Sequence, residues 1–303
     1  MTAGIDPPIA RTSGRVLRLL SCIRWEEVLL LQATLLFGAL FSIGPLTLDK
    51  AAAMAVLLIA SCCLAAHIFA FNDWSGMEWD LRDPNRAASV FLRRGVKRNE
   101  MGRLCAGLAA AGLFLLVPLG AWALGVGMGI VILSALYSAP RLHLKGAPLA
   151  GSALHFAGGF LYFLLAWSLF RPVDMQGFAI GAYFALGHVA GHLTHESRDW
   201  EADHLNQINT NAVTFGRRRN FMASLAVFTV ADALLAILAL RNIVPRALIV
   251  VVPLYLLQLF WSLQLLRAGL TFAGIRRMQW RYRMLYAGLG LIMVATMLPV
   301  IAS

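Results

Sequence analysis

Residues 51–71 read AAAMAVLLIASCCLAAHIFAF and continue without a break into the polar stretch NDWSGMEWDLRDPNR at 72–86. The first part is apolar throughout and does not alternate with a period of two. It therefore predicts an α-helix and not a strand of a barrel. Its length suits a segment that crosses the ~30 Å hydrocarbon core of a bilayer. We expect a membrane span that runs into a polar segment at one face of the membrane.

The polar stretch carries three aspartates at a spacing that favours one helical face. At about 3.6 residues per turn, the positions that fall close together are Asp73, Gly76, Asp80 and Asp83. Carboxylates on one face repel each other unless a cation neutralises them, and a hard divalent cation with oxygen ligands does this best. Taken alone, such a short segment is more typical of a solvated helix end.

A second acidic patch favours a site instead. Residues 196–203 read ESRDWEAD and again follow an apolar run. The chain has only 15 acidic residues, and the two patches contain eight of them: Asp73, Glu78, Asp80, Asp83, Glu196, Asp199, Glu201 and Asp203. Because acid is rare elsewhere, we predict that the two patches are the two halves of one site.

The composition places the whole chain in a membrane. Of 303 residues, 59% are hydrophobic and 14% are charged, and the mean hydropathy is +0.71. A soluble domain is about a quarter charged. The net charge of +11 does not indicate nucleic-acid binding, because the basic residues lie between apolar runs and form no separate domain. We expect one all-α, polytopic membrane domain over 1–303, with 1–25 as a basic N-terminal segment.

The apolar runs predict nine transmembrane helices, each near the length that crosses a bilayer. The approximate spans are 28–47, 51–71, 104–119, 121–138, 148–170, 176–195, 220–240, 247–266 and 282–302. The connections after odd-numbered spans contain only Lys50, Arg171, Arg241 and Arg246, whereas the other 22 of the 26 basic residues lie at the N-terminus, after even-numbered spans or, for Arg283, at the start of the ninth span. The positive-inside rule then predicts that the N-terminus and both acidic patches are cytoplasmic, with Ser303 on the far side. In a bacterium this would be the plasma (inner) membrane.

Basic residues in the same loops complete a site for a diphosphate. Arg86 follows the first patch, and Lys145 lies in the loop after the fourth span, which begins at Tyr137 and Ser138. Carboxylates hold Mg²⁺, the metal bridges phosphate oxygens, and Lys or Arg meets the remaining negative charge. Most of the other arginines in these loops are better explained by topology and lipid headgroups.

Polar residues also occur within the spans. His188, His192 and His195 follow helical spacing and predict a polar cavity wall, since Mg²⁺ prefers oxygen ligands to imidazole. We expect His67 and His155 to line the same cavity. Asp232 lies deep in the seventh span. An ionisable group there is a candidate for function, although it could also bond to a neighbouring helix.

With these motifs in order, the chain resembles the UbiA superfamily of intramembrane prenyltransferases over nearly its whole length. The family's first motif, Asn-Asp-x-x-Asp-x-x-x-Asp with a downstream Arg, matches Asn72, Asp73, Asp80 and Arg86. Its second motif, Asp-x-x-x-Asp, matches Asp199 and Asp203, preceded by Arg198. Its Tyr-Ser-x-Pro…Lys-Gly loop matches Tyr137, Ser138, Pro140, Lys145 and Gly146.

The resemblance implies a Mg²⁺-dependent prenyltransferase that moves an isoprenyl group from an allylic diphosphate to a lipophilic, aromatic or isoprenoid acceptor. It implies that Mg²⁺, or Mn²⁺, is held by Asp73, Asp80, Asp199 and Asp203. Arg86 and Lys145 would then stabilise the leaving diphosphate. Substrate-binding residues implied around them are Asn72, Asp83, Tyr137, Ser138, Arg198, His192 and Glu196.

The chain departs from the family pattern at Gly76, where the middle aspartate of the first motif is missing. Asp83, one helical turn beyond Asp80, could supply the lost carboxylate. Because the first motif is altered, a terpene cyclase of the same superfamily remains an alternative. Transport is a more remote alternative, since it predicts charges near the middle of the membrane and broken helices. Here the acids lie at the ends of spans.

Overall fold

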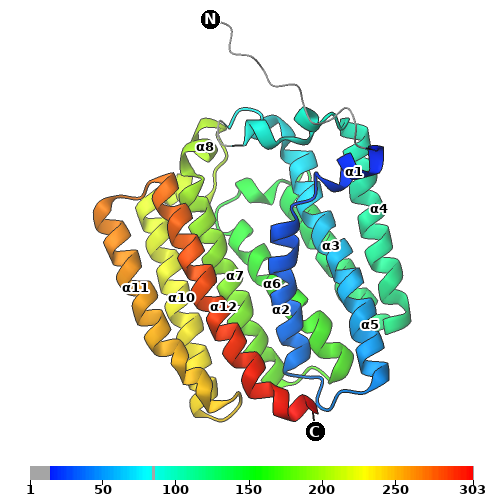
Figure 1. Cartoon of the computed structure of the whole chain (residues 1–303). Coiled ribbons are helices and arrows are strands. Elements are labelled where there is room, and N and C mark those ends of the chain that lie inside the picture. Colours follow the sequence, from blue (N-terminus) through cyan, green and yellow to red (C-terminus); the bar gives the residue numbers. More distant parts are fainter. Residues whose placement is uncertain (1–13, 84–85, 303) are drawn as a thin grey trace, which may run out of the picture.

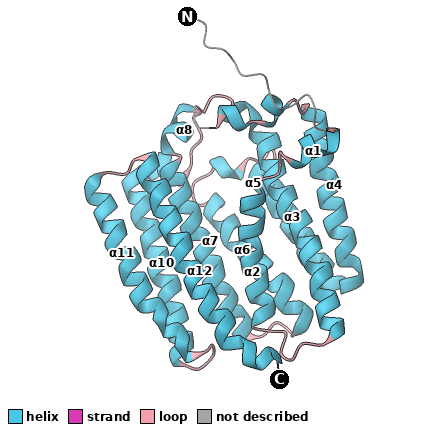
Figure 2. Ribbon diagram, in the orientation of Figure 1, coloured by secondary structure: helices cyan, strands magenta, loops and turns pink. Residues whose placement is uncertain are grey.

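The computed structural model describes residues 14–83 and 86–302 of the chain. Within these residues every regular element is helical, which agrees with the all-α prediction (Figure 2). The described part contains nine helices of 16 residues or more. They are α2 (Trp25–Leu40), α3 (Leu48–Asp80), α4 (Arg98–Leu116), α5 (Ala121–Ser138), α6 (Ala150–Phe170), α7 (Met175–Arg198), α10 (Arg217–Leu240), α11 (Val251–Ala268) and α12 (Phe272–Ala302). The shorter helices are α1 (Arg15–Leu20), α8 (Trp200–Leu205) and α9 (Asn211–Phe215).

Seven of the described helices are long and apolar enough to cross a membrane. The other two long helices are α2 and α7, which lie within the same bundle (Figure 1). Helix α2 has only 16 residues, and α7 is less apolar because it carries three histidines. The chain is therefore an integral membrane protein, and the count of nine spans depends on these two shorter or more polar helices.

The described part of the bundle has two large apolar cores and two smaller apolar clusters. One large core joins α2, α3, α5 and α6 around Leu35, Leu64 and Leu165. The other joins α6, α7, α10 and α12 around Phe163, Leu235 and Leu289. Helices α10, α11 and α12 lie side by side on one edge, and α3 and α4 lie on the opposite edge (Figure 1).

Small residues allow helices to approach closely, as is common inside membranes. A Cβ atom on Gly38 of α2 would lie only 2.3 Å from the backbone oxygen of Phe163 in α6. A Cβ on Gly177 of α7 would lie 2.4 Å from the ring of Trp167. These two contacts hold α2 and α7 against α6, and α2, α6 and α7 are three of the helices that surround the cavity described below.

The first acidic motif belongs to a helix and not to a loop. Helix α3 begins after Thr47, whose side chain accepts a hydrogen bond from the Lys50 backbone, and it remains helical through Asp80. The sequence-based expectation of a span ending at 71 is therefore too short. The helix ends at Asp80, so the expectation that Asp83 lies one further turn along it is wrong. Asp83 is reached through a turn instead, and its backbone nitrogen donates to the Trp79 and Asp80 oxygens.

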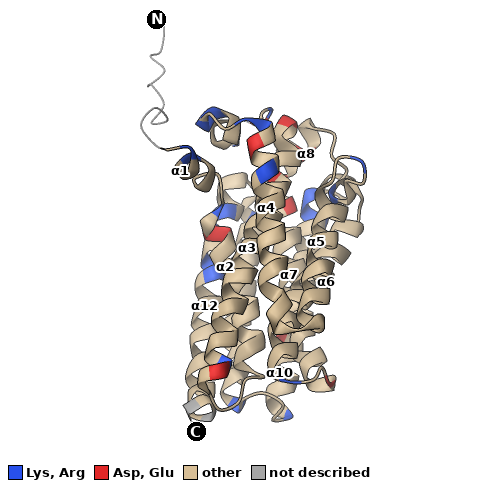
Figure 3. Cartoon of the chain, turned by 90° about the vertical axis from the view of Figure 1, so that its right-hand side faces the viewer, with Lys and Arg blue, Asp and Glu red and all other residues tan. Residues whose placement is uncertain are grey.

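Both acidic patches lie at the same end of the bundle. The end of α3 and the α7–α8 junction lie at the same end of the bundle as α1 (Figure 1), where many charged residues gather (Figure 3). The first turn of α3 with Lys50, the end of α6 at Arg171 and the end of α10 at Arg241 lie at the opposite end. This matches the sequence-based separation of the basic residues into a large and a small group.

Candidate active site

Asp73 on α3 is held by an arginine that the sequence analysis did not select. Arg24 lies immediately before α2, and its Nε donates to Oδ2 of Asp73 at 3.0 Å while its Nη2 donates to Oδ1. This is a two-point contact between a guanidinium and a carboxylate, which fixes both side chains. No local pattern around Arg24 indicates this role, because the two residues are 49 positions apart.

Arg86 connects the two acidic patches. Its Nη2 donates to Oδ2 of Asp199 at 2.7 Å, its Nη1 donates to Oδ1 of Asp80 at 3.4 Å, and its Nε lies 3.6 Å from Oδ2 of Asp83. Burial alone would lower the pKa of Arg86, but the carboxylates, Asp199 foremost, outweigh it and raise that pKa above its usual range. The two acidic patches therefore come together as predicted, and the guanidinium of Arg86 contacts carboxylates of both.

The two aspartates of the second motif have opposite electrostatic environments. Burial disfavours the charged form of Asp199, but hydrogen bonds from Arg198 and the charges of Arg198 and Arg86 prevail and lower its pKa to about 2. Burial raises the pKa of Asp203 to about 7, although Lys145 opposes the shift. Among the described side chains none forms an ion pair with Asp203 within 4.0 Å. Asp203 is thus a buried carboxylate that lacks a close cation.

Arg198 and Glu196 are each committed to partners. Nε and Nη2 of Arg198 donate to the two oxygens of Asp199 at 2.7 and 2.9 Å, and Nη1 donates to Gln279 on α12 at 3.0 Å. Glu196 accepts from Nδ2 of Asn211 at 3.0 Å and lies 3.1 Å from Nε2 of His192. Although Glu196 belongs to the second patch in sequence, its contacts are with this histidine and amide.

A cavity of about 850 Å³ extends from the patches into the bundle. The predicted site residues that line it are Asn72, Arg86, Tyr137, Ser138, Lys145, His192, Glu196, Asp199 and Asp203. Farther from the acidic end its wall is mostly apolar, with Phe37, Phe184 and Leu289 among the lining residues. Asp73, Asp80, Asp83 and Arg198 are not part of this wall; they lie behind it and contact Arg24, Arg86 and Asp199.

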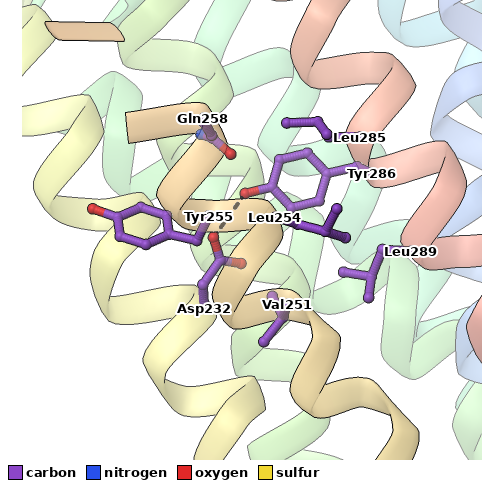
Figure 4. A pocket seen from close by; sticks show the side chains of 8 residues that line it. All are labelled: Asp232, Val251, Leu254, Tyr255, Gln258, Leu285, Tyr286 and Leu289. Carbon is purple, nitrogen blue, oxygen red and sulfur yellow. Dashed lines mark hydrogen bonds between the residues drawn. The ribbon is translucent and has the colours of Figure 1, made fainter. Parts of the chain in front are cut away.

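Two of the predicted polar positions form contacts between helices, and of these only Asp232 lines the cavity. His67 does not line the cavity, which corrects the sequence-based expectation. Its Nδ1 donates to the backbone oxygen of Cys105 at 2.9 Å and joins α3 to α4. Asp232 is buried, and its Oδ2 accepts from the hydroxyl of Tyr286 at 3.0 Å, as Figure 4 shows. This bond links α10 to α12, which was one of the two roles expected for Asp232.

The carboxylates of the two patches do not yet surround a common point. Within residues 14–83 and 86–302, no three His, Cys, Asp or Glu side chains lie close enough to bind one metal ion. The guanidinium groups of Arg24 and Arg86 contact oxygens that a cation would otherwise bind. The donor atoms are hard carboxylate oxygens, the type that Mg²⁺ prefers. The carboxylates of the two patches are therefore the right ligand type for such an ion. In this arrangement Arg24 and Arg86 neutralise some of the same oxygens.

The fold and the site define a class of protein: an integral membrane bundle with two acidic motifs at the mouth of an intramembrane cavity. The sequence matches the UbiA prenyltransferase family over residues 31–298. The chain therefore belongs to the UbiA prenyltransferase family, as its motifs predicted.

Solved structures show the same fold. A UbiA homologue from Archaeoglobus fulgidus bound to GPP and Mg²⁺ superposes with a TM-score of 0.71 at 15% identity, covering 92% of this chain and 99% of that one. A digeranylgeranylglyceryl phosphate synthase has a TM-score of 0.70 at 18% identity, covering 93% and 98%. The apo UbiA homologue from Aeropyrum pernix K1 has a TM-score of 0.61 at 17% identity, covering 92% and 98%. No curated protein matches the sequence.

Proposed function

We propose that the protein transfers an isoprenyl group from an allylic polyprenyl diphosphate to a lipophilic acceptor and requires Mg²⁺ or Mn²⁺. One observation carries this proposal: Arg86 joins Asp80 and Asp199, from the two acidic motifs, at the mouth of a largely apolar cavity. A diphosphate needs concentrated positive charge, and an isoprenyl chain needs an apolar space. Both lie next to each other here.

The residues that would hold the metal are Asp73, Asp80, Asp199 and Asp203. When bound, the ion would supply positive charge against the diphosphate as it leaves. Asp203 supports this role, because its buried carboxylate has no cation within 4.0 Å among the described side chains and a bound cation would stabilise its charged form. The likeness in fold to homologues solved with GPP or DMAPP and Mg²⁺ also supports it.

The chain's own cations would orient and stabilise the diphosphate. Arg86 and Lys145 both line the cavity close to Asp199 and Asp203, so a diphosphate at this end would meet both. Arg86 offers a planar set of donors, whereas Lys145 offers a single charge. Asn72, Tyr137 and Ser138 would line the substrate next to them. Arg24 neutralises Asp73 and would hold that carboxylate in position.

The apolar wall would protect the reaction from water. An allylic cation reacts with any nucleophile that reaches it, so the acceptor must compete only with a small amount of solvent. The aromatic residues Phe37 and Phe184, whose stacked rings lie 5.4 Å apart, contribute to this wall. We propose that the acidic end faces the cytoplasm, because 22 of the 26 basic residues belong to that end or to the N-terminal segment.

A substrate panel tests the proposed function. Purified protein in nanodiscs would be incubated with geranyl, farnesyl or geranylgeranyl diphosphate, Mg²⁺ and hydroxyl-bearing acceptors such as 4-octylphenol and dodecanol, together with aromatic acceptors that lack a hydroxyl. We expect prenylated acceptors by mass spectrometry and loss of the product in EDTA, with recovery when Mg²⁺ or Mn²⁺ is added. Undiminished activity in EDTA would exclude the metal-dependent mechanism. A cyclic hydrocarbon formed without acceptor would identify the cyclase instead.

Gly76 and Asp83 provide a more local test. Asp83 lies 3.6 Å from Nε of Arg86, similar to the 3.4 Å between Asp80 and Nη1, so we propose that Asp83 supplies the carboxylate missing at Gly76. Asp83→Asn should then reduce turnover about as much as Asp80→Asn, by roughly 10²-fold. Because a Cβ on Gly76 would lie 3.8 Å from Oδ2 of Asp80 and meet no closer atom, Gly76→Asp should partly restore the Asp83→Asn enzyme. Steady-state rates of the four proteins decide this, and a fully active Asp83→Asn enzyme would assign Asp83 to the turn alone.

A further inference from the structure

Two histidines from different helices form a stacked pair in the cavity wall. The rings of His155 on α6 and His192 on α7 lie 3.8 Å apart with an interplanar angle of 12°. The ring of Tyr137 on α5 meets His155 edge-on at 5.0 Å. All three side chains line the cavity that extends from the acidic motifs. The pair is therefore placed to meet a molecule bound there.

The hydrogen bonds of His155 determine which of its ring nitrogens carries the proton. Nδ1 lies 2.8 Å from the backbone oxygen of Gly151. A carbonyl oxygen can only accept, so Nδ1 must be the donor and carry the hydrogen. In the neutral ring Nε2 is then a free acceptor. Within the described part of the chain, Nε2 of His155 has no hydrogen-bond partner.

A buried carboxylate stands behind the second ring. Nε2 of His192 lies 3.1 Å from Oε1 of Glu196, and both side chains are about 5% exposed. Asn211 holds Glu196 through its Nδ2 at 3.0 Å, and Asn211 itself contacts the Ser152 hydroxyl at 3.1 Å and the Leu149 backbone. At this distance the carboxylate stabilises positive charge on a neighbouring imidazole. The contact is one of charge, since within the described residues Nε2 of His192 makes no aligned hydrogen bond.

The position of the His192 ring leaves little room for a side chain at Gly151. A Cβ atom at this position would lie 3.2 Å from Nε2 of His192. The same residue provides the backbone oxygen that accepts from His155. Gly151 thus contributes to both the orientation of His155 and the space for His192, which ties the two rings into one unit.

We infer that His155 is the general base that removes the proton from a hydroxyl group of the acceptor, with His192 and Glu196 as positioning residues. This inference rests on the proposed prenyl transfer. The bond between the diphosphate oxygen and C1 of the isoprenyl group breaks, and its electron pair leaves with the diphosphate. The acceptor oxygen forms the new bond to C1 with a lone pair. Its O–H bond breaks, and the proton moves to Nε2 of His155, so atoms and charges balance.

The inference names the acceptor class: a lipophilic alcohol or phenol, whose nucleophile carries a proton that must leave. Metal and arginines activate the diphosphate but provide no acceptor for this proton, since Arg86 and Arg198 are donors only. The imidazolium formed on His155 stacks against His192, which in turn lies 3.1 Å from the buried Glu196, so a negative charge stands behind the pair of rings.

His188 offers a matched control within the same wall. It also lines the cavity, but its Nε2 lies 2.9 Å from the hydroxyl of Thr34. A Cβ on Gly159 would lie 2.5 Å from its ring, so His188 packs tightly against α6. Its role is a helix contact between α2, α6 and α7. Substitution there removes a cavity-lining histidine whose Nε2, unlike that of His155, already has a side-chain partner.

The test compares transfer with diphosphate binding. With geranyl diphosphate and the hydroxyl-bearing acceptor that the wild type uses best, His155→Gln should lower kcat for transfer by roughly 10²-fold or more. Its KM for geranyl diphosphate should stay unchanged, because glutamine keeps the polarity but cannot take the proton. Glu196→Gln should lower kcat by roughly tenfold. Imidazole in the buffer should restore part of the activity of His155→Ala. His188→Gln should keep the wild-type ratio of transfer to diphosphate binding.

Several results would overturn the inference. One is a wild-type transfer rate in the His155→Gln enzyme. Another is an equal loss of transfer and of geranyl diphosphate binding that imidazole does not rescue, which would show that His155 has only a structural role. A wild type that prenylates only acceptors lacking a hydroxyl group also contradicts it. Failure of the proposed function looks different, because the wild type would then form no prenylated product with any acceptor of the panel.

Discussion

Asp199→Asn should reduce turnover by roughly 10³-fold or more, because it removes a charge that two arginines share and that the proposed metal would bind. Asp199 accepts from Arg86 at 2.7 Å and from Arg198 at 2.7 and 2.9 Å, and its low pKa of about 2 shows that the site is built for the charged form. Asparagine keeps the size and one acceptor oxygen. The loss should therefore come from charge, with the helical content by circular dichroism unchanged.

The readouts are the transfer rate and binding of Mn²⁺ by electron paramagnetic resonance. Asp199→Asn should lower both, since a metal site loses a carboxylate. Glu201→Gln is the matched control: Glu201 lies two residues away and forms an ion pair with Arg217 at 2.6 Å, but its side chain is 57% exposed. Exposed pairs of this kind contribute little, so Glu201→Gln should stay near wild type. An Asp199→Asn enzyme with full activity would exclude Asp199 as a ligand.

Arg86→Ala should have the second large effect, a loss of roughly 10²- to 10³-fold in kcat/KM for the diphosphate. Arg86 is the contact between the two acidic motifs, so its removal deletes the proposed diphosphate donor and leaves Asp80, Asp83 and Asp199 without its guanidinium. Arg86→Lys should restore little, because one ammonium group cannot reach three carboxylates with fixed geometry. Arg93→Ala, an exposed residue of the same connection, should stay near wild type.

Thermal unfolding provides an independent readout for Arg86. Without its guanidinium, the carboxylates repel one another, and the melting temperature should fall in EDTA. Mg²⁺ should raise the melting temperature of Arg86→Ala more than that of the wild type, because the ion then replaces the missing charge. Equal stabilisation of both proteins by Mg²⁺ would show that Arg86 and the metal do not act on the same carboxylates.

Local sequence patterns predicted the positions of the long helices well. Continuous apolar runs have no period of two, and in lipid a single segment satisfies its own backbone only as a helix. The run at 51–71 therefore had to be helical, and it is the central part of α3. The error at its end, where helix continues to Asp80, has a simple reason: hydropathy reports where lipid contact ends and not where backbone hydrogen bonding ends.

The acidic motifs could also be recognised from the local sequence, because acidic residues are scarce and these two groups lie at the ends of spans. Both groups follow even-numbered spans, so they were expected at the same end of the bundle. Side-chain partners could not be read in this way. Arg24 and Asp73 are 49 residues apart, and Arg86 and Asp199 are 113 apart, so their pairing depends on how each helix is rotated and where neighbouring helices pack. The same holds for Glu196, because helix packing brings it next to His192 and Asn211. It also holds for His155, whose Nε2 is left as an acceptor because Nδ1 donates its hydrogen to the backbone oxygen of Gly151. Composition and periodicity thus predict the class and the acidic motifs and place both motifs at one end of the bundle, whereas the partners of the charged groups and of the ring nitrogens arise from contacts between distant helices.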